Sequence, residues 1–327
     1  MRVTRFGVFA FAGCLALNSA VLAGPLDPPG GPVAGTMKPL DQVEPRIAIN
    51  AVNTPGDADS LFRIAEPGSY YLTGNVDGAP GKIGIEIAAS GVTLDLGGFC
   101  LDGDVNGIIP SLDGVRVSVL RTSITVRNGA VRNWGEDGID LVSAQSGKVE
   151  DVMVDANSDH GIVVGPACTV ERCGSSDNGG DGIRLASGGG TARECTSSFN
   201  TGDGFRLIGA GSRVVACTAH TNSGDGIQVD VAGVIQDNVC TSNGYAGATG
   251  YGIHVTGAGS RLESNTVQYN DIGIKTLTVG SLIARNIATS NVDDYDVADN
   301  GFNYGGFGGI NSIETDEWYQ LPWTNFK

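Results

Sequence analysis

Short runs in which apolar and polar residues alternate recur along residues 124–291. Each run is three to five residues long and rich in β-branched residues, and Gly, Asn, Asp or Ser separates it from the next. Alternation with a period of two is typical of β-strands, and the stretch shows no useful length of the 3.6-residue helical pattern. The pattern therefore predicts many short strands joined by tight turns.

These strands belong to a repeating unit with two markers. The first is a Gly, followed by an apolar residue, any residue and usually another apolar residue, in copies 23, 21, 22, 22, 26 and 21 residues apart: Gly138, Gly161, Gly182, Gly204, Gly226, Gly252 and Gly273. The second is an Asn after a strand, at intervals of 21, 22, 22, 21, 27 and 21 residues: Asn157, Asn178, Asn200, Asn222, Asn243, Asn270 and Asn291. One insertion near Gly244–Gly250 explains the long gap in both series. Three short strands per period fit one coil of a parallel β-helix, with coils stacked at ~4.8 Å.

Stacking places equivalent residues of successive coils on top of one another. Five residues before the marker Asn, one column contains Cys173, Cys195 and Cys217 and then Asn238, Asn265 and Asn286. We expect this column to point inward, with unbridged thiols followed by a buried amide stack, because in-register neighbours have parallel Cβ vectors. A Cys168–Cys173 disulfide is the alternative. We also expect the marker Asn to take the left-handed turn, and the marker Gly to permit positive φ or close backbone approach.

The repeat resembles the right-handed parallel β-helix of the pectate-lyase-like superfamily over roughly residues 80–291. The resemblance implies an all-β, right-handed, single-stranded solenoid. It also implies proton abstraction next to a uronate carboxylate, by enzymes that use Arg or Lys and often Ca²⁺. Related hydrolases use an Asn-x-Asp segment, which Asn157-Ser158-Asp159 matches by its letters, and a Gly-His-Gly segment, which Asp159-His160-Gly161 matches in part. Their Arg-x-Lys and the Asp-Pro-His-Asp of alginate epimerases are missing.

Four segments are expected along the chain. Residues 1–23, with Arg2, Arg5 and an apolar run, predict a signal peptide removed near Ala23 and hence a secreted or cell-envelope protein, with a lipoprotein signal at Cys14 as the alternative. Residues 24–60 predict a Pro/Gly-rich linker, and 61–291 the β-helix with its N-terminal cap. Residues 292–327 concentrate aromatics and predict a C-terminal cap, or a docking or homo-oligomerisation segment.

The charge of the chain argues against nucleic acid as a partner, and the length of its N-terminal apolar run argues against a membrane span. The chain has 20 Lys+Arg against 36 Asp+Glu, a net charge of −16, which argues against nucleic acid because phosphate binding needs clustered cations. The apolar run near the start is too short for a transmembrane span.

Two polar columns flank the marker Gly. Directly before it stand Asp137, His160, Asp181, Asp203, Asp225, Tyr251 and Ile272; two residues after it stand Asp140, Val163, Arg184, Arg206, Gln228, His254 and Lys275. The three consecutive residues Asp181, Asp203 and Asp225 make local turn hydrogen bonds in one interpretation and a Ca²⁺ site in the other.

The second column suggests a carbohydrate site. Arg184 and Arg206 should lie side by side and could hold sugar carboxylates with their guanidinium forks. With Asp159 and His160 they form the candidate catalytic group, and Trp134 and His254 are added as sugar-binding candidates. Further aromatic platforms are few: Phe199, Tyr245, Tyr251 and Tyr269.

Two functions remain open from the sequence. The first is a secreted β-helix that binds or processes an acidic polysaccharide, in the manner of a polyuronide lyase. The second is a non-catalytic surface or envelope protein that uses the solenoid as a rigid spacer.

Overall fold

The computed structural model describes residues 46–103, 111–244, 250–298, 307–308 and 325–326. These residues form strands and turns without a helix, so no helix in this part of the chain is long and apolar enough to cross a membrane. The predicted signal peptide, and Trp318, Tyr319 and Trp323 of the predicted C-terminal cap, lie outside the described residues.

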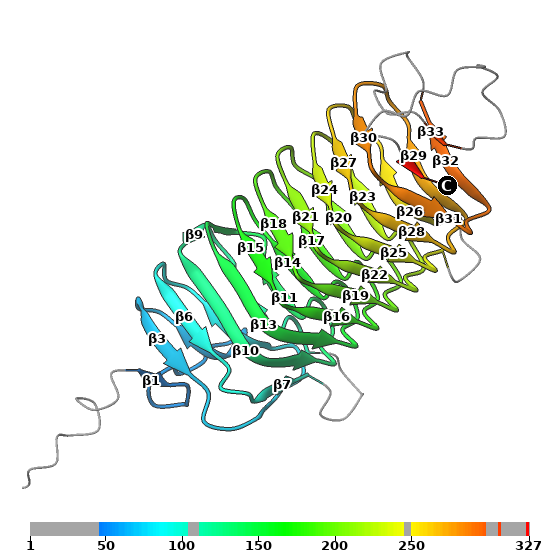
Figure 1. Ribbon diagram of the computed structural model, residues 1–327. Coiled ribbons are helices and arrows are strands. Elements are labelled where there is room, and N and C mark those ends of the chain that lie inside the picture. Colours follow the sequence, from blue (N-terminus) through cyan, green and yellow to red (C-terminus); the bar gives the residue numbers. More distant parts are fainter. Residues whose placement is uncertain (1–45, 104–110, 245–249, 299–306, 309–324, 327) are drawn as a thin grey trace, which may run out of the picture. The chain divides into compact units, whose positions relative to one another are not determined.

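The strands wind into a parallel β-solenoid with three faces, and each coil adds one strand to each face in turn (Figure 1). We call the 11-stranded sheet face 1. It consists of β2 (Ser60–Ile64), β5 (Ile83–Ile87), β8 (Val115–Arg116), β11 (Ile139–Leu141), β14 (Ile162–Val164), β17 (Ile183–Leu185), β20 (Phe205–Leu207), β23 (Ile227–Val229), β26 (Tyr251–Val255), β29 (Ile272–Thr276) and β32 (Asp293–Val297).

The other two faces share two long strands, β10 (Ile124–Arg132) and β13 (Lys148–Asp155), which run around the corner between them. Face 2 adds β1 (Ile47–Ala48), β3 (Gly68–Tyr71), β6 (Val92–Asp95), β15 (Thr169–Glu171), β18 (Thr191–Arg193), β21 (Arg213–Val215), β24 (Val234–Gln236), β27 (Arg261–Glu263) and β30 (Leu282–Ala284). Face 3 adds β4 (Val76–Asp77), β7 (Cys100–Asp102), β16 (Gly174–Ser176), β19 (Thr196–Ser198), β22 (Thr218–His220), β25 (Val239–Thr241), β28 (Thr266–Gln268), β31 (Ile287–Thr289), β33 (Phe307–Gly308) and β34 (Asn325–Phe326). A separate two-stranded pair joins β9 (Arg121–Thr122) to β12 (Ala144–Gln145).

The core follows from the period-two pattern. On face 1, Ile183 and Leu185 of β17 point inward, while Arg184 between them points outward. In the next coil Phe205 stacks on Ile183 and Leu207 on Leu185, and all four side chains are at most 1% exposed. The same register continues from coil to coil, so each inward apolar column is a continuous strip of the core.

Two polar ladders run inside the solenoid, as expected. In the marker Asn ladder, the side-chain amide of Asn178 donates to Asn200 Oδ1 at 2.9 Å, and the backbone N–H of Asn178 donates to the same oxygen at 3.1 Å. The thiol column is also confirmed, because Cys195 Sγ lies 3.5 Å from the backbone N of Cys173 and the described cysteines are unbridged. The column continues as the predicted amide stack of Asn238, Asn265 and Asn286.

The turn residues differ from the expectation in one respect. The residue with positive φ is the one before each marker Asn, for example Phe199 (φ 59°) and Tyr269 (φ 59°). The Asn itself stays in ordinary geometry, because its task is to keep its amide on the ladder axis. The marker Gly is needed for close approach, since a Cβ on Gly182 would overlap Ser197 Oγ and Asn200 Nδ2.

The folded unit is longer at both ends than the predicted 61–291. Within the predicted linker, β1 pairs in register with β3, so residues 47 and 48 already form part of a coil. After residue 291, β32 continues face 1 by pairing with β29, and Tyr295 stacks on Ile274 and packs against the core. Asp293 and Asp294, which belong to the segment predicted as the C-terminal cap, therefore lie on this additional coil.

Candidate functional site

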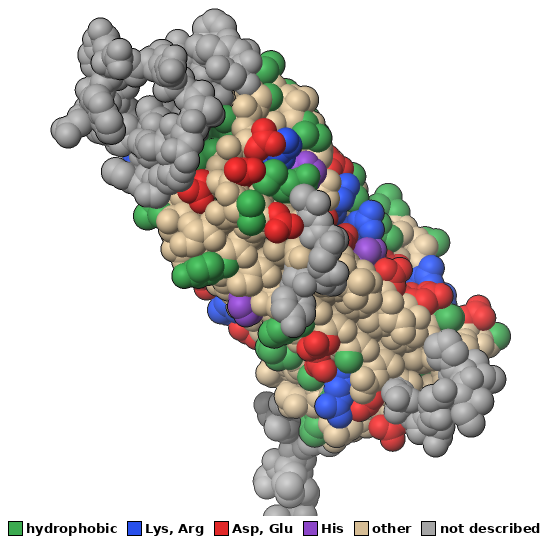
Figure 2. Space-filling view, turned by 90° about the vertical axis from the view of Figure 1, so that its right-hand side faces the viewer, with side chains coloured by type: hydrophobic (Ala, Val, Ile, Leu, Met, Phe, Trp, Pro, Cys, Tyr) green, Lys and Arg blue, Asp and Glu red, His purple; other side chains and the backbone are tan. Residues whose placement is uncertain are grey.

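The outer surface of face 1 carries most of the ordered charge pattern. Arg184 of β17 and Arg206 of β20 are in-register neighbours, which confirms their predicted side-by-side position. Asp140 and Val163 precede them in the same column, and Gln228, His254 and Lys275 follow. Basic, acidic and histidine side chains accordingly follow a line along one side of the solenoid (Figure 2).

The column before the marker Gly forms a hydrogen-bonded chain between coils. From Asp137 to Asp225, each side chain accepts a hydrogen bond from the backbone N–H of the equivalent residue in the next coil. Asp137 Oδ1 accepts from His160 at 2.8 Å, Asp181 Oδ1 from Asp203 at 2.9 Å, and Asp203 Oδ1 from Asp225 at 2.8 Å. These contacts favour the structural interpretation of the Asp column, although the bonds cross between coils instead of closing a turn within one coil.

Burial changes the protonation of this column. Desolvation raises the pKa of Asp137 to about 7, and the nearby carboxylates Asp113, Asp140 and Asp159 raise it further, against the opposing effect of the His160 N–H. Desolvation also raises the pKa of Asp203 to about 7 and that of Asp113 to about 6. Carboxyl groups with such values can exchange protons near neutral pH.

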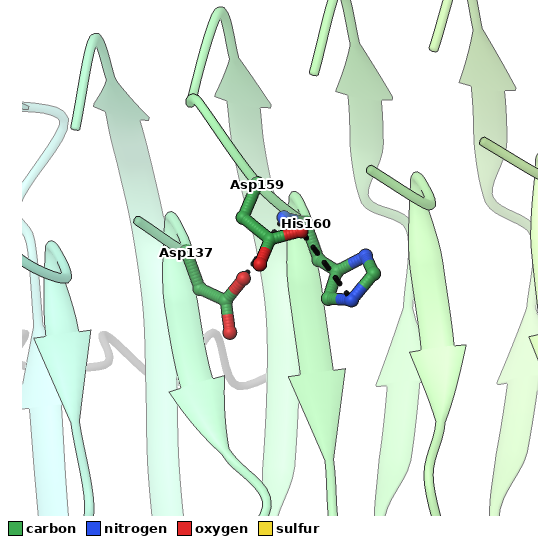
Figure 3. A group of neighbouring side chains, drawn as sticks. All are labelled: Asp137, Asp159 and His160. Carbon is green, nitrogen blue, oxygen red and sulfur yellow. Dashed lines mark hydrogen bonds and ion pairs between the residues drawn. The ribbon is translucent and has the colours of Figure 1, made fainter. Parts of the chain in front are cut away.

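Asp137, Asp159 and His160 converge at the edge of face 1 (Figure 3). One ligand-type atom from each side chain lies within 4.8 Å of the others. Asp137 immediately precedes the marker Gly before β11, and Asp159 and His160 occupy the turn that leads into β14. Asp159 is the exposed member, while His160 is mostly buried. The turn geometry thus brings an exposed carboxylate, a protonatable carboxyl and an imidazole together.

The two arginines next to this group are paired to different degrees. Arg206 contacts Asp203 Oδ2 at 3.3 Å and Asp230 Oδ1 at 3.2 Å, and it also bonds Gln228. Arg184 has Asp181 Oδ2 only at 3.9 Å, and its Nη1 lies 2.7 Å from His160 Nε2. Its side chain is 33% exposed. Arg184 is therefore the less neutralised of the two cations.

The contact between Arg184 and His160 brings two hydrogen-bond donors together, which is unfavourable. His160 Nδ1 accepts the backbone N–H of Asp181 at 2.7 Å, so in the neutral imidazole the proton resides on Nε2. Nε2 then cannot also accept from Arg184, and the acceptor available to its proton is Asp159 Oδ1 at 3.5 Å. An anionic ligand would give Arg184 an acceptor in place of His160 Nε2, and would give His160 Nε2–H a closer acceptor than Asp159.

The carboxylate oxygens of Asp181, Asp203 and Asp225 are already engaged, which does not favour the predicted Ca²⁺ site. Their Oδ1 atoms accept backbone N–H groups, while Asp203 Oδ2 faces Arg206 and Asp225 Oδ2 contacts His254 Nδ1 at 2.8 Å. A calcium ion needs six to eight oxygen ligands and would have to displace these cations. Asp137, Asp159 and His160 are close enough for a metal, but Arg184 is placed against the His160 nitrogen that a metal would use. Calcium binding stays a prediction.

One sugar-binding candidate is wrong. Trp134 is fully buried, and its indole N–H donates to the Leu101 carbonyl at 3.2 Å, so it offers no face to a ligand. It fills the space next to Gly84 and Gly114, glycines of the first coils. His254 does lie on face 1, but its ring is engaged by Asp225 and by Tyr251, whose ring centroid is 4.4 Å away.

The sequence interpretation missed Asp137 and Asp140 as site residues. Both were placed in the correct columns, but the columns alone do not reveal that burial raises the pKa of both carboxyl groups. Arg116 in the preceding coil is 3.8 Å from Asp140 Oδ2, and Val163 is the next residue in that column. A signal existed in the spacing: where other coils combine Asp with Arg three residues later, this coil combines Asp with Asp.

Comparison with known proteins agrees with this architecture. Residues 81–214 and 117–288 match the family model described as a right-handed β-helix region. No curated protein matches the chain. Among solved structures, the A-modules of the mannuronan C-5 epimerases AlgE6 and AlgE4 of Azotobacter vinelandii both superpose with a TM-score of 0.60 at 16% identity. The match covers 79% of this chain and 86% and 87% of those modules, respectively.

A pectate lyase, Pel9A, is similar with a TM-score of 0.48 and 16% identity, over 73% of this chain and 72% of the lyase. At this identity the matches to the two epimerase modules establish the fold alone. The family-model match, which spans more than half of the sequence, and the parallel three-faced solenoid lead to the same assignment. The chain belongs to the right-handed β-helix family.

Proposed function

We propose that this protein is an extracytoplasmic polysaccharide-processing β-helix that acts on an acidic glycan at face 1. The observation that carries the proposal is Arg184, a poorly neutralised guanidinium beside His160 and the proton-exchanging group Asp137. The solved β-helix structures named as epimerases and a lyase of uronate polymers support the choice of substrate class by analogy.

The chemistry that fits these groups is removal of the proton next to a uronate carboxylate. Arg184 leaves His160 and pairs with the substrate carboxylate, and His160 Nε2–H donates to the same carboxylate. Asp137, in its ionised form, takes the proton from the carbon next to the carboxylate. In an elimination, the glycosidic C–O bond then breaks and its oxygen takes the proton from Asp137. In an epimerisation, a water molecule delivers a proton to the opposite face of the carbon, and the resulting hydroxide takes the proton held by Asp137.

Asp159 has a separate part in this scheme. Its charge raises the pKa of Asp137, so it makes Asp137 a stronger base. It also holds the Nε2–H of His160 until the substrate carboxylate replaces it.

The first test assays polygalacturonate and polymannuronate for both reactions, with and without added Ca²⁺. Unsaturated-product absorbance reports elimination, and solvent-deuterium incorporation next to the carboxylate reports epimerisation. We expect the full chain to give one of these signals, with a loss of at least a hundredfold in Arg184→Ala. Arg213→Ala, an exposed arginine on face 2, is the matched control and should retain activity. Absence of both signals on both polymers would remove the enzymatic proposal.

The pH dependence provides a second prediction. With Asp137 as the base, kcat/KM should rise with pH through about 7, following the raised pKa of this carboxyl. Asp159→Asn should move this rise to lower pH, because it removes one of the charges that raise the pKa of Asp137. Asp137→Asn keeps an oxygen for the His160 N–H but should abolish the reaction. A profile unchanged in Asp159→Asn would contradict the assignment.

The non-catalytic spacer is the second candidate. It is favoured by the Asp column, whose Oδ1 atoms bind backbone groups in coil after coil and so contribute to the scaffold. It predicts no turnover of either polymer together with retention of the protein at the cell surface, lost on deletion of residues 299–327.

A further inference from the structure

A second surface, separate from the charged line of face 1, has the composition of a sugar site. An open hollow of about 410 Å³ lies over the turns that follow β25, β28 and β31. Its lining includes Tyr269, the hydroxyl residues Ser242 and Ser290, the carboxylate of Asp271, and Val292. These residues come from three successive coils, because their marker Asn neighbours Asn243, Asn270 and Asn291 are bonded in one ladder.

Tyr269 is the unusual member of this group. Its side chain is 64% exposed, so it adds little to the core, and its backbone has a φ of 59°. The corner demands this left-handed conformation in every coil, and a bulky aromatic side chain tolerates it less well than Asn, Asp or Gly do. At the equivalent corner of neighbouring coils the chain uses Thr221, Ser242 and Ser290. An exposed aromatic at a costly backbone position calls for a reason other than packing.

The charge of the hollow limits the ligand. Among the described residues, Asp271 is the only ionisable carboxylate in the lining of the hollow, and none of the described lining residues is Lys, Arg or His. A uronate or phosphate would meet repulsion there. The available groups are an aromatic face, hydroxyls and a carboxylate that accepts hydrogen bonds, with the exposed Val292 (82%) at the edge. This combination suits a pyranose ring, whose C–H face stacks on an aromatic and whose hydroxyls donate to a carboxylate.

We propose that the Tyr269 hollow is a binding site for a neutral, uncharged sugar unit of a polysaccharide. The site is independent of the reaction proposed for face 1, because it shares no residue with Asp137, His160 or Arg184. It would anchor the protein to a neutral glycan, or to neutral units of a mixed polymer.

Binding of cellohexaose and mannohexaose to the full chain tests this, measured by isothermal titration calorimetry, with hexagalacturonate as the charged comparison. We expect at least one neutral hexasaccharide to bind. Tyr269→Ala should weaken that binding about tenfold or more, as expected for the loss of a stacking face, whereas Tyr269→Phe should retain it. Binding of hexagalacturonate should be unaffected by Tyr269→Ala.

The matched control is Phe199→Ala. Phe199 occupies the same corner at the same φ and is 53% exposed, but it lies outside the hollow and packs edge-on to His220 at 5.7 Å. Its removal should leave neutral-sugar binding unchanged. Arg184→Ala should also leave it unchanged, which separates this site from the reaction on face 1. The proposal is overturned if neither neutral hexasaccharide binds at millimolar concentration, or if Tyr269→Ala and Phe199→Ala weaken binding equally.

Discussion

At the scale of single residues, the outer edge of face 1 contains carboxyl groups whose surroundings disfavour the ionised form. Asp203 is 8% exposed and lies between Asp181 and Asp225, whose charges add to its desolvation. Its Oδ1 is nevertheless required as an acceptor for the Asp225 N–H. Asp203 therefore stabilises the fold through its acceptor oxygen, whereas a negative charge on its carboxyl group destabilises the fold.

Asp203→Asn should stabilise the protein at neutral pH. The pKa of Asp203 is about 7 in the folded protein, against 3.8 for an unperturbed aspartate, so the folded state binds more protons between these values. The free energy of unfolding consequently falls as pH rises from about 4 to about 7. We expect Asp203→Asn to add about 1–3 kcal/mol at pH 8 and nothing below about pH 4, as measured by urea unfolding. The exposed Asp177→Asn serves as control, and a gain that is equal at both pH values would contradict this assignment.

At the scale of the repeat element, the turn before β20 packs Gly, Ser and Asn residues against one another. Ser197 Oγ donates to the Gly204 carbonyl at 2.7 Å and accepts from Asn200 Nδ2 at 3.0 Å. Gly182 of the preceding coil lies against both side chains and leaves no space for a Cβ. The absence of a side chain at the Gly is what allows the ladder amides to remain close to the strand.

Gly182→Ala should therefore be severely destabilising, by about 3 kcal/mol or more, because the new methyl group would have to displace buried and hydrogen-bonded groups. Gly74→Ala is the matched control, since a Cβ at Gly74 has no atom within 4 Å and its φ lies outside the left-handed region. The thermal unfolding midpoints of the two variants, compared with that of the unaltered protein, test this prediction. Comparable midpoints for the two would show that the turn adapts more readily than the contacts indicate.

The repeat itself was readable from the sequence because every buried column recurs with the same period. The thiol column, the Asn238 amide stack and the Arg184–Arg206 neighbourhood all follow from counting along the chain. What counting could not supply is the direction and depth of a side chain. Trp134 looked available for sugar stacking but fills the core. Asp137 acquires its raised pKa first from burial and then from the charges of Asp113, Asp140 and Asp159.

At the scale of the whole solenoid, each coil contacts mainly the coils before and after it. Stability should then behave as a sum of coil and neighbour contributions, and one coil should be removable. Asn200 and Asn222 are equivalent positions in adjacent coils, joined by the amide hydrogen bond at 2.9 Å. The chain between them is one full turn of the winding.

Deletion of residues 201–222 should leave a folded protein that is one coil shorter, with the group of Asp137, His160 and Arg184 intact. Deletion of residues 201–211 removes half a turn and should prevent folding of the following coils, because outward residues would be forced inward. Circular dichroism and protease resistance distinguish the two. If both deletions are equally tolerated, the stacking register does not determine the fold.

The buried thiols can report on the local opening of the solenoid. Cys173, Cys195 and Cys217 of this column are each at most 3% exposed, and so is Cys240, which lies in the neighbouring inward column of the next coil. An alkylating reagent can reach each sulfur only when that part of the winding opens. Mass spectrometry of the labelled peptides would thus time the opening of individual coils, with reporters that the chain already contains and without any introduced probe.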